Sequence, residues 1–489
     1  MSSKWERRSN CADDPPATAV AVATGDDAGA FVAACARPQG ASDRLHRRLL
    51  VATALVLATL AGPLAADNLP PAPTELGTIR RNEQGKLEVV RPPAGGPAAA
   101  PIPVEAAAGG WAGLQRPAAD SKPGVVGSGR TIVVGEREAV RSISEAARLA
   151  RDGDTIEIRP GEYRRQAVVW TQERLTIRGV GKRPVLIADG DSAEGKALWV
   201  VRSAQMTIDN LEFRGARVAA GNGAGIRFET GHLKVVRCAF FDNEMGILTS
   251  NVADAVLEVE DSEFGAAPRH AGALHHLLYA GTIARLKVSG SRFQQGHRGH
   301  LLKSRARASS ILYNLLVDGA AGSASYELEF PNGGVAWVIG NIIGQSAATD
   351  NPVVVSYGAE GERWPDNTLY LVHNTLVDDT PGGRFLQVWS DRLPAATEVW
   401  TINNLLVGRG ILAPQGAGRH DGNQSIEVAT LVDVDGLPFV LPQASPLRGR
   451  AKAPGFARGQ SLMPTAEFRL PATTLPLPPG KPLSPGALQ

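Results

Sequence analysis

The stretch that decides the fold is IDNLEF at residues 208–213, where the small polar residue Asn210 is enclosed by apolar neighbours. The same short unit, with Asn, Ser or Cys between apolar residues, returns seven more times. The polar residue of the unit stands at Asn210, Cys238, Ser262, Ser291, Asn314, Asn341, Asn374 and Asn404. The steps between these positions run from 23 to 33 residues, about the length that one coil of a β-solenoid needs. The repeat therefore predicts an all-β chain, a right-handed parallel β-helix.

The repeated polar residue also predicts how the coils are held together. An Asn at the same turn of every coil forms a ladder in which each side chain bonds the backbone of its neighbour. We expect the solenoid to span Thr131 to Leu412. A short helix over 142–150 is expected to cap its first coil, because Ile143, Ala146, Ala147 and Ala150 share one helical face and Ser142 can cap it.

The chain ahead of the solenoid divides into three predicted parts. Residues 44–66 read as a signal peptide, with basic residues before an apolar run and small residues before Asp67. The run is too short for a comfortable membrane span, and no other span is expected once it is removed. Residues 1–43 are interpreted as a mis-called start or a leader without structure. Residues 67–130, rich in Pro, Ala and Gly, predict a disordered linker.

Composition narrows the class of protein. The chain has 51 Lys plus Arg and 49 Asp plus Glu, which argues against a nucleic-acid partner recruited by bulk charge. Of three cysteines only Cys238 lies after the predicted cleavage site, so no internal disulfide is expected. Residues 413–489 form a Pro-rich tail that packs on the solenoid or trails from it. We expect a monomer that is periplasmic or secreted by a bacterium.

Four polar strings interrupt the repeat in consecutive coils: HHLLYAG at 275–281, GHLLKSRA at 299–306, YELEFPNGG at 326–334 and SYGAEG at 356–361. Tyr279, Lys303 and Glu329 each lie 11 or 12 positions before the next ladder residue. We therefore expect these three side chains in one column, about 4.8 Å apart.

Strand alternation predicts that the column and its neighbours face outward, since Leu302 and Leu328 should face the core. The expected catalytic residues are Tyr279, His300, Lys303, Arg305 and Tyr357. The expected substrate-binding residues are His276, Glu327, Glu329, Asn332 and Glu360. Exposed strands often carry ion pairs without function, so each residue taken singly also fits a structural role. The cluster as a unit favours a site for an acidic polysaccharide.

The segment from Thr131 to Leu412 resembles the pectate lyase-like superfamily of right-handed β-helices, which includes pectate, alginate and dermatan lyases and mannuronan epimerases. The strings DGDTI at 152–156 and PGEY at 160–163, after the predicted helix, are typical of its first coil. The four polar strings are similar to those of exported proteobacterial β-helix proteins of unsettled activity. The resemblance implies the fold and a carbohydrate-active protein.

The string LLKSRARASSILYN at 301–314 is also similar to the KS…N stretch of chondroitinase B-like alginate lyases. In those enzymes the Lys is the base, an Arg one coil later assists, and calcium neutralises the uronate carboxylate. Lys303 matches that Lys. The next coil has glutamates in place of the Arg, and His297, Arg298 and His300 stand where acidic calcium ligands are expected.

A lyase acting on a uronic-acid polymer needs a base, an acid and a group that neutralises the carboxylate. The candidates are Lys303 or His300 as base, Tyr279 or Tyr357 as acid, and Arg305, or calcium on Glu327 and Glu329, as neutraliser. One alternative is a glycoside hydrolase that uses paired carboxylates among Glu327, Glu329 and Glu360. Another is a non-catalytic exopolysaccharide-binding protein.

The targeting segment generates the first testable prediction. Mass spectrometry of the protein purified from its native source should find an N-terminus near Asp67, in a periplasmic or secreted fraction. A cytoplasmic protein that keeps residues 44–66 would contradict it.

Overall fold

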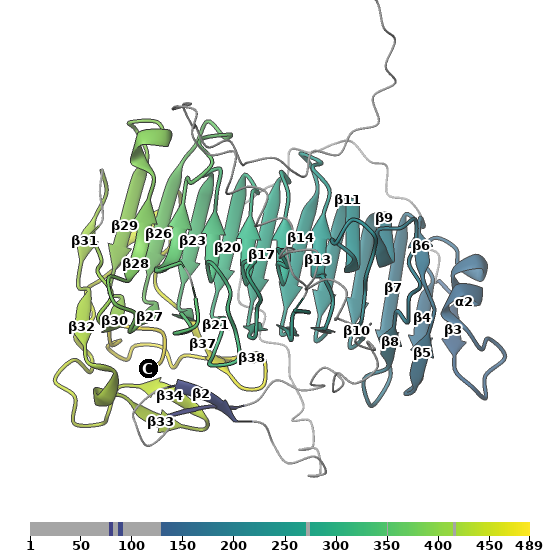
Figure 1. Ribbon diagram of the computed structural model, residues 1–489, viewed down its shortest axis with the longest axis horizontal. Coiled ribbons are helices and arrows are strands. Elements are labelled where there is room, and N and C mark those ends of the chain that lie inside the picture. Colours follow the sequence, from purple (N-terminus) through teal and green to yellow (C-terminus); the bar gives the residue numbers. More distant parts are fainter. Residues whose placement is uncertain (1–77, 82–86, 91–128, 270–273, 350, 414–416) are drawn as a thin grey trace, which may run out of the picture. The chain divides into compact units, whose positions relative to one another are not determined.

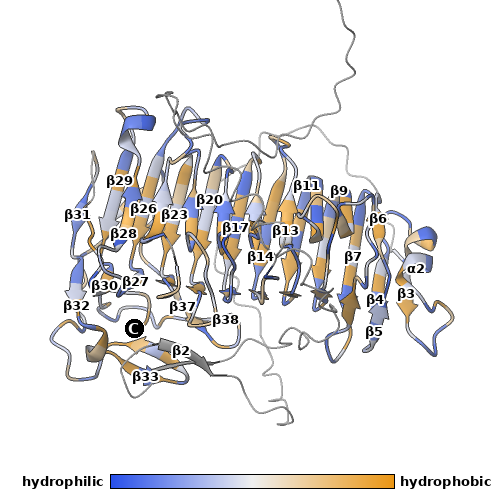
Figure 2. Ribbon diagram, in the orientation of Figure 1, coloured by the Kyte–Doolittle hydropathy of each residue, from blue (hydrophilic) through white to orange (hydrophobic). Residues whose placement is uncertain are grey.

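The chain folds into a right-handed parallel β-helix, as the repeat predicts (Figure 1). The computed structural model describes residues 129–269, 274–349, 351–413 and 417–489, and the backbone of 78–81 and 87–90. Each complete coil contributes three strands, and each strand pairs in parallel with its equivalent in the next coil. Apolar and polar residues alternate along the strands, so one side of each lines the interior (Figure 2).

The stacked strands form three sheets in the described residues, which we call the first, second and third sheets. The first contains β6 (Val168–Trp170), β13 (Met245–Thr249), β16 (Leu278–Ala280), β19 (Leu302–Ser304), β22 (Leu328–Phe330), β25 (Val353–Tyr357) and β28 (Arg384–Val388). The second contains β3 (Thr131–Val134), β4 (Thr155–Ile158), β7 (Arg174–Gly179), β14 (Val256–Glu260), β17 (Arg285–Ser289), β20 (Ala308–Leu312), β23 (Val335–Ile339), β26 (Thr368–Val372), β29 (Glu398–Ile402) and β31 (His420–Asp421). The long strands β9 (Ala197–Asp209) and β11 (Ala224–Val236) belong to both.

The third sheet continues the parallel stack to the end of the solenoid. It contains β5 (Glu162–Arg164), β8 (Val185–Ile187), β10 (Glu212–Arg214), β12 (Ala239–Phe241), β15 (Glu263–Gly265), β18 (Arg292–Phe293), β21 (Leu315–Val317), β24 (Ile342–Gly344), β27 (Thr375–Asp378), β30 (Leu405–Gly408) and β32 (Gln424–Ile426). Because β30 pairs with β32, parallel pairing continues past Leu412, where the solenoid was expected to end.

A ladder of buried side chains links successive coils at the turn between the second sheet and the third. The Oδ1 atom of Asn341 accepts from the backbone N–H of Asn314 at 2.9 Å, and Oδ1 of Asn374 accepts from that of Asn341 at 2.9 Å. Ser262 and Ser291 play the same part in earlier coils, and Asn423 adds a further rung. The Asn side chains thus satisfy backbone groups that the turn buries away from water.

The first predicted rung is wrong by one residue. Strand pairing sets Phe213 beside Phe240, which places Leu211 rather than Asn210 opposite Cys238. Asn210 occupies the preceding turn position, with a φ of 54°. That left-handed position suits Asn as well as the ladder position does, so the residue type alone could not separate the two.

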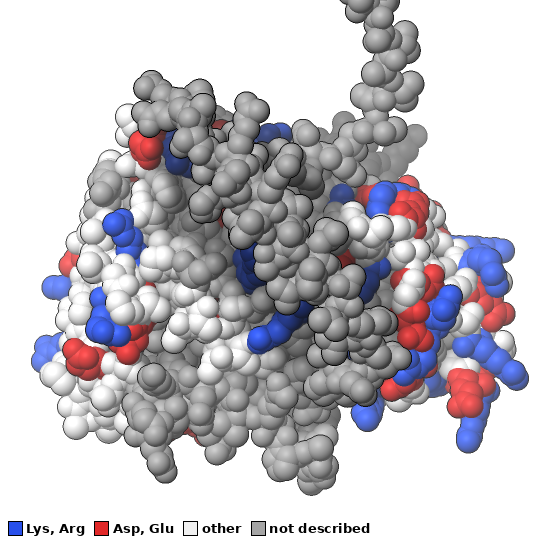
Figure 3. Space-filling view, in the orientation of Figure 1, with Lys and Arg blue, Asp and Glu red and all other residues white. Residues whose placement is uncertain are grey.

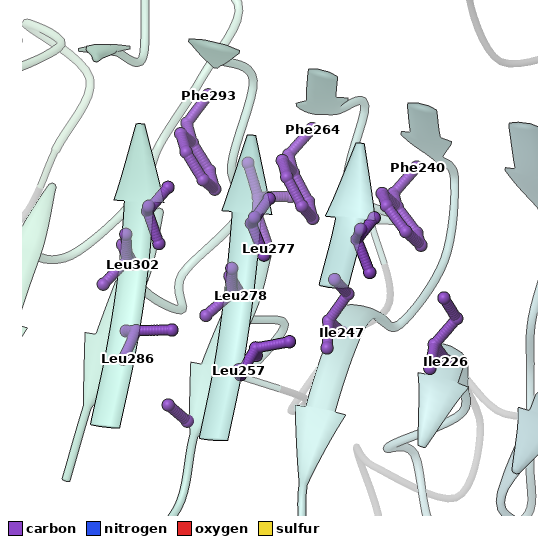
Figure 4. Packing of buried hydrophobic residues seen from close by; sticks show 14 of the residues in the cluster. Ile226, Phe240, Ile247, Leu257, Phe264, Leu277, Leu278, Leu286, Phe293 and Leu302 are labelled. Atoms are coloured by element: carbon purple, nitrogen blue, oxygen red, sulfur yellow. The ribbon is translucent and has the colours of Figure 1, made fainter. Parts of the chain in front are cut away.

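The apolar ends of the repeat stack inside the solenoid. The rings of Phe213, Phe240, Phe264 and Phe293 lie parallel in successive coils, with centroids 5.1, 4.8 and 4.6 Å apart. Figure 4 shows three of these rings in a row beside aliphatic residues of the first sheet. Equivalent residues therefore touch from coil to coil, and this continuous contact forms the core.

At the start of the solenoid, the short helix α2 (Ile143–Leu149) packs Ile143 and Ala146 into the core. Its first turn is capped by Ser142, whose Oγ accepts from the backbone N–H of Glu145 at 3.1 Å. Its assignment as the cap of the solenoid stays a prediction. Within the segment expected to be a linker, β1 (Thr78–Arg81) pairs antiparallel with β2 (Leu87–Val90). The predicted leader and signal peptide lie outside the described residues.

The C-terminal segment packs on the solenoid. It contains the antiparallel pairs β33 (Val432–Val434) with β34 (Leu437–Val440), β35 (Phe456–Ala457) with β36 (Gln460–Ser461), and β37 (Ala466–Arg469) with β38 (Thr473–Pro476). Two short 3-10 helices are η2 (Ser390–Arg392) and η3 (Val428–Thr430). Phe439 and Phe468 cover the third sheet, and Leu462 packs against Trp337 on the second. The apolar contacts of this segment thus lie on two of the three outer faces.

Charges of both signs are mixed on the coils next to α2 (Figure 3). Examples are the ion pairs Arg159–Glu138 and Arg164–Glu162. Among the described residues, no helix is long and apolar enough to cross a membrane.

The ladder generates a stability prediction. Replacing Asn341 by Ala removes an acceptor for Asn314 and a donor to the backbone oxygen of Ile311, leaving buried groups unpaired. We expect a loss of about 2–4 kcal/mol in the free energy of unfolding, measured by denaturant titration. Replacing the part-exposed loop residue Asn222 by Ala should cost less than about 0.5 kcal/mol. Equal stabilities of the two variants would contradict the ladder's role.

Candidate functional site

The outer side of the first sheet carries a column of polar residues from three successive coils. Tyr279 of β16 pairs with Lys303 of β19, and Lys303 pairs with Glu329 of β22. Their neighbours Leu302 and Leu328 face the core. Since side chains alternate along a strand, the polar column must then face away from the core. The structure thus brings together the three residues predicted to share a column.

Ion pairs connect this column to a loop. The Nζ atom of Lys303 lies 3.1 Å from Glu329 Oε2 and 3.1 Å from Glu360 Oε1. Arg305 holds Glu360 with two nitrogens, Nη1 at 2.5 Å from Oε2 and Nη2 at 2.8 Å from Oε1. Two cations and two carboxylates therefore form one connected cluster.

Arg305 also holds two polar side chains in place. Its Nε donates to the hydroxyl of Tyr279 at 2.7 Å, and its Nη1 donates to Oδ1 of Asn332 at 2.5 Å. The Tyr279 ring lies beneath both cations, with Lys303 Nζ 5.6 Å and the Arg305 guanidinium carbon 5.8 Å from its centroid. A phenol that accepts a hydrogen bond from a guanidinium is placed to release its own proton.

A second column, formed by aromatic side chains just before the strands of the first sheet, lies next to the ion pairs. His276, His300 and Tyr326 follow one another in successive coils, with ring centroids 4.7 and 4.9 Å apart. The Nδ1 atom of His300 lies 2.9 Å from Glu329 Oε2, which links the rings to the ion-pair cluster. The two atoms form an ion-pair contact at this distance, but neither His300 Nδ1 nor Glu329 Oε2 makes a hydrogen bond of regular geometry to a described residue. The contact places a carboxylate beside the imidazole, as in other histidine–carboxylate pairs.

The tautomer of His276 follows from its contacts. The backbone N–H of His300 donates to Nδ1 of His276 at 2.9 Å, so that nitrogen carries no proton. Burial lowers the pKa of His276 well below its usual value, and the neighbouring cations lower it further. A neutral ring with its proton on Nε2 is a hydrogen-bond donor at that atom and cannot accept a proton there.

The carboxylates of the cluster are held ionised. Burial acts to raise the pKa of Glu329, but His300 and Lys303 outweigh it and bring this pKa down to about 2. Burial likewise opposes ionisation of Glu360, and the hydrogen bond from Arg305 outweighs it, so the pKa of Glu360 is lowered. Neither group can act as a proton donor at neutral pH.

The loop at 358–367 joins β25 to β26 and supplies Glu360. Its backbone bonds back to the preceding coil, with the N–H of Glu360 donating to the oxygen of Pro331 at 2.8 Å. Trp364, which sequence reasoning missed, donates from Nε1 to the backbone oxygen of Arg305 at 3.0 Å. Tyr326, which the sequence reasoning also missed, lies in one of the four polar strings. Only its ring contact with His300 shows that it belongs to the site.

Tyr357 was predicted to face outward with the site, and this prediction is wrong. Strand pairing sets Tyr357 beside Phe330 and sets Ser356 beside Glu329. Its ring lies in the core, and its hydroxyl donates to the backbone oxygen of Gly334 at 2.5 Å. Because the coil of Tyr357 has a longer loop, the count of residues to the next ladder position could not give its register. A shift of one residue moves a side chain to the other face of the strand.

Glu327 was predicted to face outward beside Glu329, and this prediction is also wrong. The chain turns a corner just before β22, so residues 327 and 328 both face the interior, as Leu301 and Leu302 do one coil earlier. Both carboxyl oxygens of Glu327 are buried and accept no hydrogen bond from the other described residues. The expected calcium site on Glu327 and Glu329 fails for the same reason, because the two side chains lie on opposite sides. No group of three His, Cys, Asp or Glu side chains suited to a metal occurs in the described residues.

Two further buried acids surround Glu327. Burial raises its pKa well above the usual value, and the nearby charges of Asp318 and Asp378 raise it further. Burial also raises the pKa of Asp318 to about 7. Burial and these two acids therefore favour the protonated form of Glu327.

Comparison with known proteins adds a similarity of fold. No protein-family model matches the chain, and no curated protein matches its sequence. Among solved structures it is similar to pectate lyase Pel9A, with 13% identity over 66% of this chain and 92% of that one, at a TM-score of 0.48. It is also similar to the family 6 polysaccharide lyase Pedsa3628 from Pseudopedobacter saltans, with 13% identity over 66% of this chain and 98% of that one, at a TM-score of 0.34.

A third similar structure is a pectin methylesterase from Aspergillus niger, with 11% identity over 60% of this chain and 85% of that one, at a TM-score of 0.33. At these identities the similarity concerns the type of fold and not the reaction.

The buried acid generates a prediction on stability and pH. Replacing Glu327 by Leu should stabilise the protein by about 1–3 kcal/mol at pH 7, because it removes an unpaired polar group from the core. The unfolded chain releases the proton of Glu327 near pH 4.5 and the folded chain retains it, so wild-type stability falls as pH rises above 4.5. The gain should therefore be smaller at pH 4 than at pH 8 in thermal melts. A variant less stable than wild type at pH 8 would show that Glu327 has a partner.

Proposed function

We propose that this protein is an exported polysaccharide lyase that cleaves a uronic-acid polymer by β-elimination on the outer face of the first sheet. The observation that carries the proposal is the pairing of His300 with Glu329 beside the pairing of Arg305 with Tyr279. These two pairs supply an oriented base and a polarised acid on adjacent coils. Export is part of the proposal and rests on the predicted signal peptide at 44–66.

His300 is the better base. Glu329 lies against Nδ1 and leaves Nε2 to take the proton from the carbon next to the uronate carboxylate. Lys303, the base implied by the resemblance to alginate lyases, lies between two carboxylates at 3.1 Å. An ammonium in that position has no lone pair to offer, so Lys303 acts as a cation that holds negative charge.

Arg305 and Tyr279 complete the reaction. As His300 removes the proton, charge develops on the uronate carboxylate, and the guanidinium of Arg305 stabilises it. The bond from carbon 4 to the glycosidic oxygen breaks, a double bond forms between carbons 4 and 5, and Tyr279 gives its proton to the leaving oxygen. The products are a reducing end and an unsaturated uronate end.

The hydrolase alternative is weaker. Glycoside hydrolysis needs one protonated carboxylic acid and one carboxylate flanking the bond. The pKa values of Glu329 and Glu360 are both lowered, so neither supplies the acid, and the protonated Glu327 faces the core. A binding protein without activity remains the second candidate, since ion pairs and rings also suit sugar binding.

The proposal is tested with the protein purified from Asp67 onward. It is incubated with polygalacturonate, alginate, hyaluronate and a neutral glucan, and ultraviolet absorbance reports new unsaturated ends. We expect such absorbance with at least one uronic-acid polymer and none with the glucan. New reducing ends without that absorbance would indicate hydrolysis, and binding without new ends would indicate a binding protein.

Single substitutions test the assigned roles. His300→Ala and Tyr279→Phe should each lower kcat by at least about 100-fold, the usual contribution of a general base or acid. The phenylalanine retains the ring beneath Lys303, so melting should change little. His232→Ala, on the second sheet, is the matched control and should keep wild-type kcat. Activity of His300→Ala above a tenth of wild type would exclude His300 as the base.

A further inference from the structure

The two cations of the site already hold a carboxylate, and it comes from the protein. Arg305 contacts both oxygens of Glu360, and Lys303 contacts one of them. A guanidinium that meets a carboxylate through two nitrogens forms the geometry in which proteins recognise free carboxylates. Glu360 therefore occupies the position that the carboxylate of a uronic acid would take.

The two carboxylates of the cluster differ in how firmly they are placed. The Glu329 side chain is 3% exposed and belongs to a strand, where it also supports His300. The Glu360 side chain is 42% exposed and belongs to a loop. Of the two, only Glu360 reaches solvent; if it turns away, Lys303 keeps Glu329, and Arg305 is left for another carboxylate to pair with.

The loop is built to present this side chain. It is ten residues long, at 358–367, while the equivalent connections have four residues at 281–284 and at 331–334 and nine at 389–397. Gly358 and Gly361 on either side of Glu360 have φ values of 88° and 83°, which form a tight turn. Backbone bonds from Gly358 and Glu360 to the preceding coil hold the turn, so the Glu360 side chain can move while the loop stays in place.

Charge balance makes exchange necessary. Lys303 and Arg305 are balanced by Glu329 and Glu360. A uronate carboxylate added beside Glu360 would bring a third negative charge to two cations, and like charges so close together repel in a partly buried site.

We propose that Lys303 and Arg305 form a carboxylate-binding subsite for a hexuronate and that Glu360 is its resident carboxylate, which the substrate must displace. This inference rests on the proposed function for its role in turnover, but the binding subsite can be tested without turnover. Glu360 then sets the affinity and selectivity of the site, because a neutral sugar gains nothing that would compensate for breaking its ion pairs.

The test uses free D-galacturonate as the probe, with calorimetry on wild type, Glu360→Gln and the control Glu362→Gln. Glu362 is exposed on the same loop and has no ion pair among the described residues, so this control makes the same change in net charge. We expect Glu360→Gln to bind galacturonate at least tenfold more tightly than wild type, with Glu362→Gln within twofold of wild type. None of the three proteins should bind galactose. Adding Arg305→Gln to Glu360→Gln should abolish the gain.

The outcomes separate this inference from the proposed function. Unchanged affinity in a folded Glu360→Gln variant would overturn the inference, as would inorganic sulfate binding more tightly than galacturonate. If Glu360→Gln lowers kcat on a polymer and leaves KM unchanged, Glu360 is catalytic, and the lyase function stands without the exchange. If Glu360→Gln gains affinity although wild type cleaves no polymer, the subsite stands and the lyase function fails. Glu360→Ala provides the same comparison should the glutamine variant not fold.

Discussion

The rest of the structure depends on the buried ladder of Asn and Ser side chains at the turn between the second and third sheets. Each ladder oxygen accepts from the backbone of the neighbouring coil, at 2.9 Å for Asn314, Asn341 and Asn374. A coil that slipped by one residue would lose these bonds and turn its apolar side chains outward. The ladder thus holds every coil in register with the next, and the stacked Phe rings add continuous contact inside.

Register is also what makes a site from residues far apart in the sequence. With the coils aligned, Tyr279, Lys303 and Glu329 become neighbours in one column. Lengthening one connection between β25 and β26 then brings Glu360 against this column without disturbing the stack. The C-terminal segment makes its apolar contacts on the second and third sheets. A regular scaffold and one long loop are therefore enough to place two cations, two carboxylates and a phenol together.

Environment, more than residue type, decides what each acid in this region does. Glu327 and Glu329 are two positions apart, yet the pKa of Glu329 falls to about 2 and that of Glu327 rises well above normal. One faces His300 and Lys303, and the other faces an apolar column and two further acids. The same residue type is thus an ion-pair partner on the outer face of the solenoid, while burial inside favours its protonated form.

The sequence by itself determined the fold, because the repeat spacing and the alternation of apolar residues leave few ways to bury the core. It also predicted the column of Tyr279, Lys303 and Glu329, since counting from the ladder measures position along a coil. Only the tertiary structure decided that Tyr357 and Glu327 face the core and that Leu211, not Asn210, stands at the turn position opposite Cys238. These three depend on corners and loop lengths, where a one-residue shift moves a side chain to the other face. The bond between Arg305 and Glu360 likewise joins residues 55 apart across a loop whose path no local pattern specifies.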